Sequence, residues 1–166
     1  GGDEAVFERC RPLFEAMGRH IVHVGANGSG QTVKLSNQVI VALNLLAMAE
    51  GLAFAAKAGV DLQKMLSVVQ KGAAGSWALD NLAPRVLRGD FDPGFMVKLQ
   101  QKDLRLALET AEAVNLPLLG TGLVQQLLRS VQAHGEEDDG TQAIVKALER
   151  LGNFQLPTRD ESIAQN

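Results

Sequence analysis

The chain has 166 residues, of which 46% are hydrophobic and 21% charged, and its formal net charge is −3. These values are typical of a globular protein that needs no disulfide or metal to hold its core, because a domain of this size buries roughly 68–70% of its unfolded surface. The small acidic charge and the lack of a basic block argue against a nucleic-acid partner.

Composition also limits the metal, redox and membrane classes. The single cysteine, Cys10, cannot form an internal disulfide and is expected to be a small buried residue. His20, His23 and His134 lack metal-ligand spacing, so they are interpreted as structural and no metal is expected. The first residues lack the features of a signal peptide, and the longest apolar run, about eleven residues, is too short to span a bilayer. A cytoplasmic protein with no membrane partner is predicted.

The first expected elements are a helix and a strand. Residues 3–17 show a loosely helical apolar pattern with Asp3 as a candidate N-cap, and Pro12 is expected to break or restart the helix. The stretch "RHIVHVG", residues 19–25, is typical of one short strand. Because a lone strand needs partners and no other is predicted downstream, we expect its sheet to involve residues outside this chain.

A long helix is predicted over residues 31–58, a stretch without proline and with one interior glycine, Gly51. Such a helix is about 42 Å long. Its middle, "VIVALNLLAMA", is apolar on every side and should be buried on every side, as the helix around which the others pack. Gly59 is expected to end it.

Shorter helices are expected in the rest of the chain. Asp61 and Ser76 are candidate N-caps, Pro84 should bend the helix that contains it, and Trp77 is expected in the core. The expected helices cover residues 62–71, 77–89, 96–114, 122–134 and 141–151, followed by a flexible tail at 153–166. The predicted fold class is therefore mostly α, with helices around a long central helix and a helix–strand piece in front.

One polar stripe marks the start of the long helix. Because successive helical residues turn by about 100°, one stripe holds Lys34, Asn37, Gln38, Val41 and Asn44. The helix dipole and partial burial would both disfavour the ammonium form of a lysine there, and such a lysine suits general acid/base work. Asn37 would then hold a substrate oxygen beside it. A lysine that simply extends into solvent is the open alternative.

The loop before this helix is rich in glycine. Gly28 and Gly30 allow the backbone to approach a ligand, and free N–H groups at a helix start can bind an anion such as a carboxylate. Val33 occupies the place of the third glycine in G-x-G-x-x-G, so the dinucleotide-binding fingerprint is absent.

A second polar segment, "FDPGFMVKLQQKD", covers residues 91–103. It places Lys98 and Lys102 one helical turn apart, where they repel each other unless an anionic group is near. Asp103 lies beside them, and a solvated helix face is the simpler interpretation of this segment alone.

Three spaced motifs together resemble the β-hydroxyacid dehydrogenase family, which includes 3-hydroxyisobutyrate dehydrogenase, tartronate semialdehyde reductase and the glyoxylate/succinic semialdehyde reductases. "GSGQTVKLSNQ" is similar to the family segment G-x-G-x-x-x-K-x-x-N, and the resemblance continues through "AEGLAFAAKAGVD", "GDFDPGF" and "LQQKDLRLAL". It covers about residues 1–152, in order and with the expected separations. Gln38, after "KLSN", resembles the tartronate semialdehyde reductase branch.

The resemblance implies a domain organisation and an activity. Residues 1–27 would be the C-terminal end of a Rossmann domain that binds NAD or NADP, and residues 28–152 an all-α C-terminal domain that completes the site and forms a homodimer or homotetramer. The implied reaction interconverts small hydroxy acids and their semialdehydes or keto acids, of the tartronate semialdehyde, glyoxylate or 3-hydroxyisobutyrate class.

The resemblance also implies residue roles. Lys34 would be the catalytic acid/base and Asn37 the residue that orients substrate, with Gly28 and Gly30 in the loop that leads to them. Lys102 would contact the cofactor, with Phe95 and Asp103 in the same cofactor-binding segment. Two alternatives remain: a non-enzymatic helical dimerisation module, and a 6-phosphogluconate dehydrogenase-like enzyme, whose phosphate-binding needs fit poorly with the few basic residues near Lys34.

Overall fold

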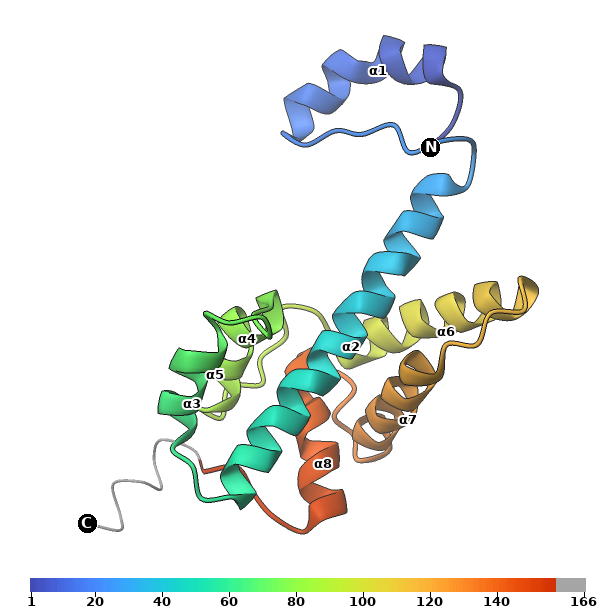
Figure 1. Ribbon diagram of the computed structural model, residues 1–166. Coiled ribbons are helices and arrows are strands. Elements are labelled where there is room, and N and C mark those ends of the chain that lie inside the picture. The colour runs from blue at the N-terminus through green and yellow to red at the C-terminus, as the bar shows by residue number, and fades with distance from the viewer. Residues whose placement is uncertain (158–166) are drawn as a thin grey trace.

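The computed structural model describes residues 1–157, and in this part of the chain the regular secondary structure is helical (Figure 1). One isolated β-bridge joins Met96 and Gly140. The helices are α1 (Glu4–Met17), α2 (Ser29–Lys57), α3 (Leu62–Val69), α4 (Trp77–Asn81), α5 (Ala83–Val86), α6 (Val97–Ala113), α7 (Leu119–Ala133), the 3₁₀ turn η1 (Thr141–Ala143) and α8 (Ile144–Gly152). The predicted mostly α fold around a long helix is confirmed.

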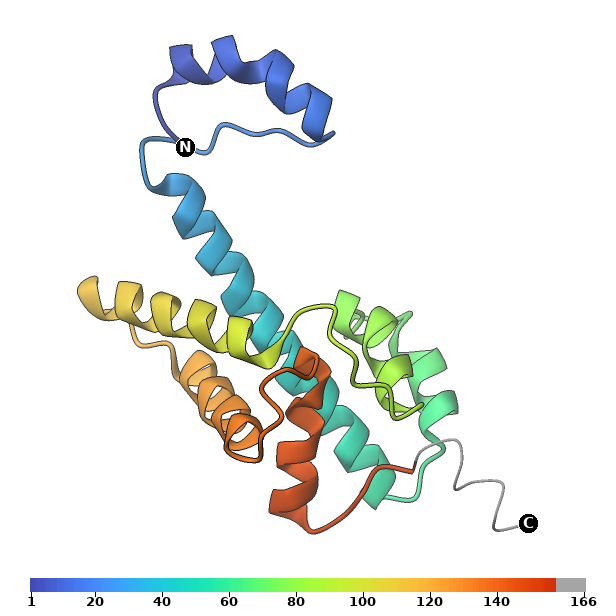
Figure 2. The same ribbon diagram turned by 180° about the vertical axis from the view of Figure 1, so that it is seen from behind.

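Helix α2 is the axis of the fold. Helices α3, α4, α6, α7 and α8 all contact it, and in both views they surround the part of α2 away from α1 (Figures 1 and 2). Residues of α2 that face the core, such as Leu45 and Leu52, are fully buried. They meet equally buried side chains of the surrounding helices, namely Leu104, Leu128 and Ile144.

The first turns of α2 are packed against fewer helices than the rest of it (Figures 1 and 2). Its first turns, which lead to α1, leave Val33 52% exposed. The expectation that the middle of α2 is buried on every side is wrong, because Ile40 is 60% and Leu43 40% exposed while the opposite side faces the core.

By length and composition alone α2 is long and apolar enough to cross a membrane. The expectation that no segment is long enough is therefore wrong on this criterion. Leu45 and Leu52 are buried in the core, and 39% of the most apolar window of α2 is buried in all.

Local capping follows the sequence. The side chains of Asp3, Asp61 and Ser76 accept hydrogen bonds from backbone N–H groups at the starts of α1, α3 and α4. Gly59 follows α2 with φ of +74°, a conformation that favours glycine. Pro84 lies in the first turn of α5, where the helix restarts after Leu82.

The expected strand at residues 19–25 is absent from the described structure. This segment runs beside α1 and is held by a hydrogen bond from the Gly2 N–H to the Gly25 carbonyl, 2.8 Å. The His23 ring contacts the Gly2 carbonyl through Nε2, also at 2.8 Å. A strand requires a neighbouring strand to complete its hydrogen bonds, and residues 1–157 supply none.

Three further expectations are wrong. Pro12 lies inside a continuous α1, which neither breaks nor restarts at this residue. Trp77 is 67% exposed, because it takes the first position of α4 while the following Ala78 and Leu79 turn into the core. Cys10 is only partly buried.

The end of the described chain packs on the core. Leu156 is 5% exposed, and its N–H donates to Glu149 Oε1 at 2.7 Å. These residues belong to the tail that was expected to be flexible, and the rest of that tail, residues 158–166, lies outside the described residues.

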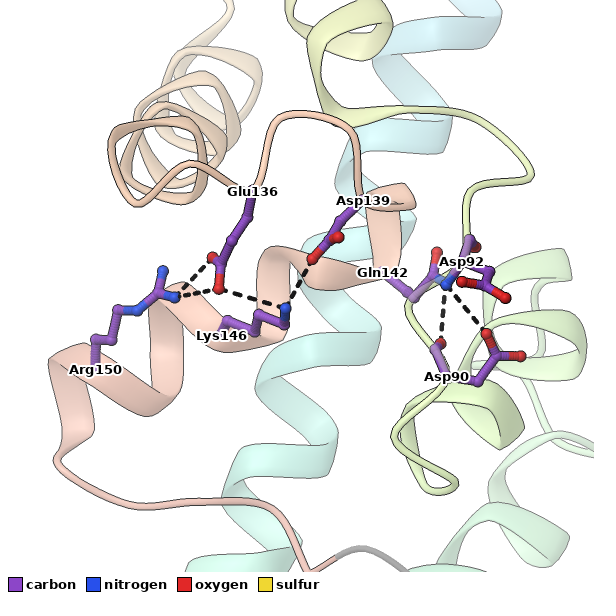
Figure 3. Close-up of polar contacts among 7 residues, drawn as sticks. All are labelled: Asp90, Asp92, Glu136, Asp139, Gln142, Lys146 and Arg150. Atoms are coloured by element: carbon purple, nitrogen blue, oxygen red, sulfur yellow. Dashed lines mark hydrogen bonds and ion pairs between the residues drawn. The ribbon is translucent and has the colours of Figure 1, made fainter.

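A set of ion pairs, the loop cluster, ties the turn after α7 to α8 (Figure 3). Its members are Glu136, Asp139, Lys146 and Arg150. Arg150 Nη2 donates to both Glu136 oxygens, at 2.7 and 2.6 Å, and Lys146 Nζ bridges Glu136 and Asp139 at 3.3 and 2.7 Å. Beside it, the Gln142 amide donates to the carbonyls of Asp90 and Asp92, which fixes the preceding loop.

Candidate functional site

The candidate site centres on a buried carboxylate. Asp103 lies on α6, which packs against α2, and its side chain is 2% exposed. Its two oxygens have different partners. Oδ2 accepts a hydrogen bond from Gln38 Nε2 at 2.5 Å, across 65 positions of sequence. Oδ1 faces the ammonium groups of Lys102, at 2.8 Å, and Lys34, at 3.7 Å. We call these four residues the site cluster.

The contacts of Oδ1 are ion pairs without the angles of a hydrogen bond, although the oxygen is shielded from solvent. Burial raises the pKa of Asp103, but the Lys102 and Gln38 contacts and the charges of Lys102 and Lys34 outweigh burial and hold the pKa below its usual range. The carboxylate is therefore charged at neutral pH, and both lysines gather around it.

The site cluster joins the two lysines singled out from sequence. Lys34 and Lys102 stand on different helices, yet one carboxylate oxygen contacts both. Their side chains are 54% and 49% exposed, so they lie on an open face of the described chain, and Lys34 is more exposed than the partly buried lysine that the sequence suggested. With two cations around one anion, the site cluster carries a net charge of about +1 at neutral pH, which suits an anionic ligand.

Other predicted site residues lie near the same two helices. Asn37 is exposed on α2, one turn from Lys34, and Phe95 lies two residues before α6 with 38% of its surface exposed. Gly28 is the N-cap residue of α2 and has φ of +94°, which favours glycine, and Gly30 lies in the first turn. Within residues 1–157 no hydrogen bond or ion pair links Asn37 to the site cluster.

Gln38 is the site residue that sequence reasoning missed as a contact. It appeared in the polar stripe with Lys34 and as a marker of one family branch. Only the structure shows that its amide bonds Asp103. A signal existed, because residues four apart share a helix face and Gln38 follows Lys34 by four positions.

Comparison with known proteins identifies the class. A solved 3-hydroxyisobutyrate dehydrogenase from Salmonella typhimurium matches with a TM-score of 0.81 and 32% identity over 87% of this chain and 51% of that chain. A second, from Mycobacterium tuberculosis in a structure with L-serine, matches with a TM-score of 0.82 and 30% identity over 89% of this chain and 53% of that one. The fold is that of a helical dehydrogenase domain.

The family follows from sequence. Residues 28–148 match the family model described as NAD-binding of NADP-dependent 3-hydroxyisobutyrate dehydrogenase, so the chain belongs to the 3-hydroxyisobutyrate dehydrogenase family. It is 46% identical over 156 residues to 2-hydroxy-3-oxopropionate reductase of Escherichia coli, covering 94% of this chain and 53% of that protein. It is also 46% identical over 160 residues to a probable 3-hydroxyisobutyrate dehydrogenase-like protein, mitochondrial, of Arabidopsis thaliana, covering 96% and 48%.

The chain spans about half the length of the curated relatives it matches. The matched part of this chain includes both helices that carry the site cluster, because residues 28–148 contain α2 and α6.

Proposed function

We propose that this chain is the C-terminal half of an NAD(P)-dependent oxidoreductase that interconverts small hydroxy acids and their semialdehydes or keto acids. Residues 1–27 would then end a nucleotide-binding domain, and residues 28–152 would form the helical domain that completes the active site. The substrate class is that of tartronate semialdehyde, glyoxylate or 3-hydroxyisobutyrate. The relatives named for such reactions support this proposal.

One observation carries the proposal: a single buried carboxylate gathers the lysines of two motifs far apart in sequence. In a purely structural ion pair, one lysine would neutralise Asp103, and a second ammonium nearby would be repelled. The extra positive charge is useful if an anion binds there, because a substrate carboxylate or the nucleotide phosphates would balance it.

The residues of this chain fit a nicotinamide nucleotide. Lys102 supplies a half-exposed ammonium for a phosphate, Asp103 fixes that lysine, and the partly exposed Phe95 ring precedes the same helix. When bound, the nicotinamide supplies or accepts the hydride. NAD or NADP is accordingly the proposed cofactor, with Phe95 and Lys102 as the residues of this half that would contact it and Asp103 as the carboxylate that holds Lys102 in place.

Lys34 then handles the proton. In reduction its ammonium donates a proton to the carbonyl oxygen, and in oxidation the neutral amine removes the proton of the hydroxyl group. Asn37 orients that oxygen beside Lys34, and the backbone at Gly28 and Gly30 approaches the substrate carboxylate. A positive group next to the oxygen also stabilises the negative charge that develops there.

The test is Lys34→Ala in the full-length enzyme, assayed with tartronate semialdehyde and glyoxylate. Turnover should fall on the order of a thousandfold, since a positioned acid/base group contributes about 10²–10⁴. Folding should stay intact because the Lys34 side chain is 54% exposed. Residues 1–166 alone should show no reductase activity. Normal turnover by Lys34→Ala would exclude the proposed mechanism.

A dimerisation module is the second candidate, and exposed apolar side chains favour some form of association. On α2, Ile40, Leu43 and Phe54 are 60%, 40% and 79% exposed. The expected homodimer or homotetramer stays a prediction, and light scattering on the purified chain measures its mass. Catalysis that depends on Lys34 separates an enzyme from a module that only associates. The cytoplasmic location also stays a prediction.

A further inference from the structure

We propose that Gln38 is a positioning residue of the site cluster: its amide holds the Asp103 carboxylate so that the opposite oxygen faces Lys34 and Lys102. The proposal rests on the proposed function for its catalytic consequence. Its structural part concerns this chain alone.

The first step is geometric. Gln38 is 9% exposed and donates from α2 to Oδ2 of Asp103 on α6. Because a carboxylate is planar and rigid, fixing Oδ2 also fixes the direction of Oδ1. Oδ1 is the atom that lies 2.8 Å from Lys102 Nζ and 3.7 Å from Lys34 Nζ. The amide therefore acts on both lysines through Asp103.

The second step concerns the choice of side chain. An uncharged donor satisfies Oδ2 without adding to the positive charge of the site cluster, whereas a third cation would increase the repulsion among the lysines. A carboxylate at this position would oppose Asp103 unless one of the two carried a proton. An apolar side chain of the same length would leave Oδ2 buried without a partner. Glutamine meets all three requirements.

The third step concerns the backbone. Lys34 and Gln38 lie one turn apart on α2, and Lys102 and Asp103 are neighbours on α6. The bond from Gln38 to Asp103 links the two helices at the level of the two lysines. It fixes the turn of α2 that carries Lys34 relative to the turn of α6 that carries Lys102, where a substrate and a cofactor would have to meet.

The chain offers a matched control. Gln101 is also 9% exposed, and its Nε2 also donates between helices, at 2.9 Å to the Gln125 carbonyl on α7. It does not contact Asp103. Gln38→Met and Gln101→Met thus remove the same kind of buried amide, one inside the site cluster and one outside it.

The first experiment is a carboxyl-carbon NMR titration of Asp103 in the chain of residues 1–166. Gln38→Met should raise the pKa of Asp103, because a donor that stabilises the charged form is gone, and Gln101→Met should leave it unchanged. An unchanged pKa in a folded Gln38→Met variant would overturn the proposal. If Gln38→Met does not fold, Gln38→Glu replaces it: a titration in which the two carboxyls are independent would then overturn the proposal.

The second experiment is kinetic, in the full-length enzyme. Gln38→Met should lower kcat roughly tenfold with a smaller change in KM, since a lost hydrogen bond to a charged group costs about that factor. Gln38→Glu should recover activity as pH falls, because the introduced carboxyl group, once protonated, donates to Asp103 as the amide does. The loss caused by Gln38→Met should not depend on pH.

The two proposals fail separately. Unchanged turnover by Lys34→Ala would overturn the proposed function, and the NMR titration would still decide the role of Gln38. Loss of turnover by Lys34→Ala, with no change of kcat or of the Asp103 pKa in Gln38→Met, would overturn the positioning role alone.

Discussion

The site cluster and the loop cluster are both built around lysine and carboxylate side chains. They differ in net charge and in whether every cation makes a hydrogen bond to a carboxylate. The loop cluster has two cations and two carboxylates, and both Lys146 and Arg150 make hydrogen bonds to them. The site cluster has two ammonium groups around one carboxylate, and Lys34 stays 3.7 Å away from it. A neutral set of ion pairs in which every cation is hydrogen-bonded suits a structural role. A set with an excess cation is suited to binding an anionic ligand.

Burial is distributed differently as well. In the loop cluster every side chain is between 22% and 32% exposed. In the site cluster the anion is 2% exposed while its two lysines are about half exposed. In both clusters burial raises the pKa of the central carboxyl and cationic partners lower it below its usual range, in Asp103 and in Glu136. The direction of the pKa shift alone therefore does not distinguish a ligand-binding cluster from a purely structural one.

After the loss expected for Lys34→Ala, the largest expected effect is on Asp103→Asn in the full-length enzyme. The substitution keeps shape and an acceptor for Gln38, but it removes the charge that holds Lys34 and Lys102 together. We expect kcat/KM to fall about a hundredfold, as when one electrostatic element of an active site is lost. Steady-state assays measure this, and circular dichroism checks that the variant is folded. Near-normal kcat/KM would mean that the site cluster is only a structural ion pair.

A smaller effect, on stability alone, is expected for Lys146→Met. Lys146 contacts two carboxylates of the loop cluster and is 22% exposed, so its loss should lower the free energy of unfolding by about 1 kcal/mol. Lys98→Met is the control, because the Lys98–Asp138 pair is 46% and 71% exposed and should contribute less. Urea unfolding compares the two. Reductase activity lost with Lys146→Met would contradict the division between the clusters.

An acid-dependent effect is expected at a third ion pair, outside both clusters. Hydrogen bonds from Arg85, at 2.8 Å to each carboxyl oxygen, are the main cause that lowers the pKa of Asp90 to about 2. A carboxyl whose pKa is depressed in the folded state stabilises it above the unfolded pKa and loses that contribution as pH falls. The stability difference between wild type and Asp90→Asn should therefore shrink between about pH 4 and pH 2. A difference that stays constant over this range, in unfolding curves recorded at each pH, would contradict the assignment.

Sequence predicted the parts of this molecule that depend on local pattern. The extent of α2, the caps at Asp61 and Ser76 and the restart of the helix around Pro84 follow from residue spacing and turn chemistry, which act over a few positions. The strand prediction for residues 19–25 was wrong because a strand needs a hydrogen-bonded partner strand. The apolar pattern of one segment does not show whether that partner is present. The expectation of a buried Trp77 was wrong because hydrophobicity alone does not show whether the first residue of a helix faces the core or the solvent.

For the candidate site, the sequence predicted which residues take part but not how they contact one another. The resemblance named Lys34, Lys102 and Asp103, but the residues alone favoured a solvated face for each lysine. What sequence could not give was the crossing of α2 and α6, which makes Asp103 the shared partner of both lysines and of Gln38. Such a contact depends on the packing of helices distant in sequence.

The smallest expected effect concerns anion binding, and it tests the charge argument directly. Sulfate added to the chain of residues 1–166 should bind weakly at the site cluster, where the ammonium groups of Lys34 and Lys102 exceed the available carboxylate. Amide shifts in α2 and α6 near these lysines should change and saturate, whereas shifts around Lys146 and Arg150 should not. Lys102→Met should weaken the effect, and higher sodium chloride should reduce it by screening. Equal shifts at both clusters would show that the excess charge of the site cluster does not select anions, since a neutral set of ion pairs in which every cation is hydrogen-bonded offers sulfate no comparable attraction.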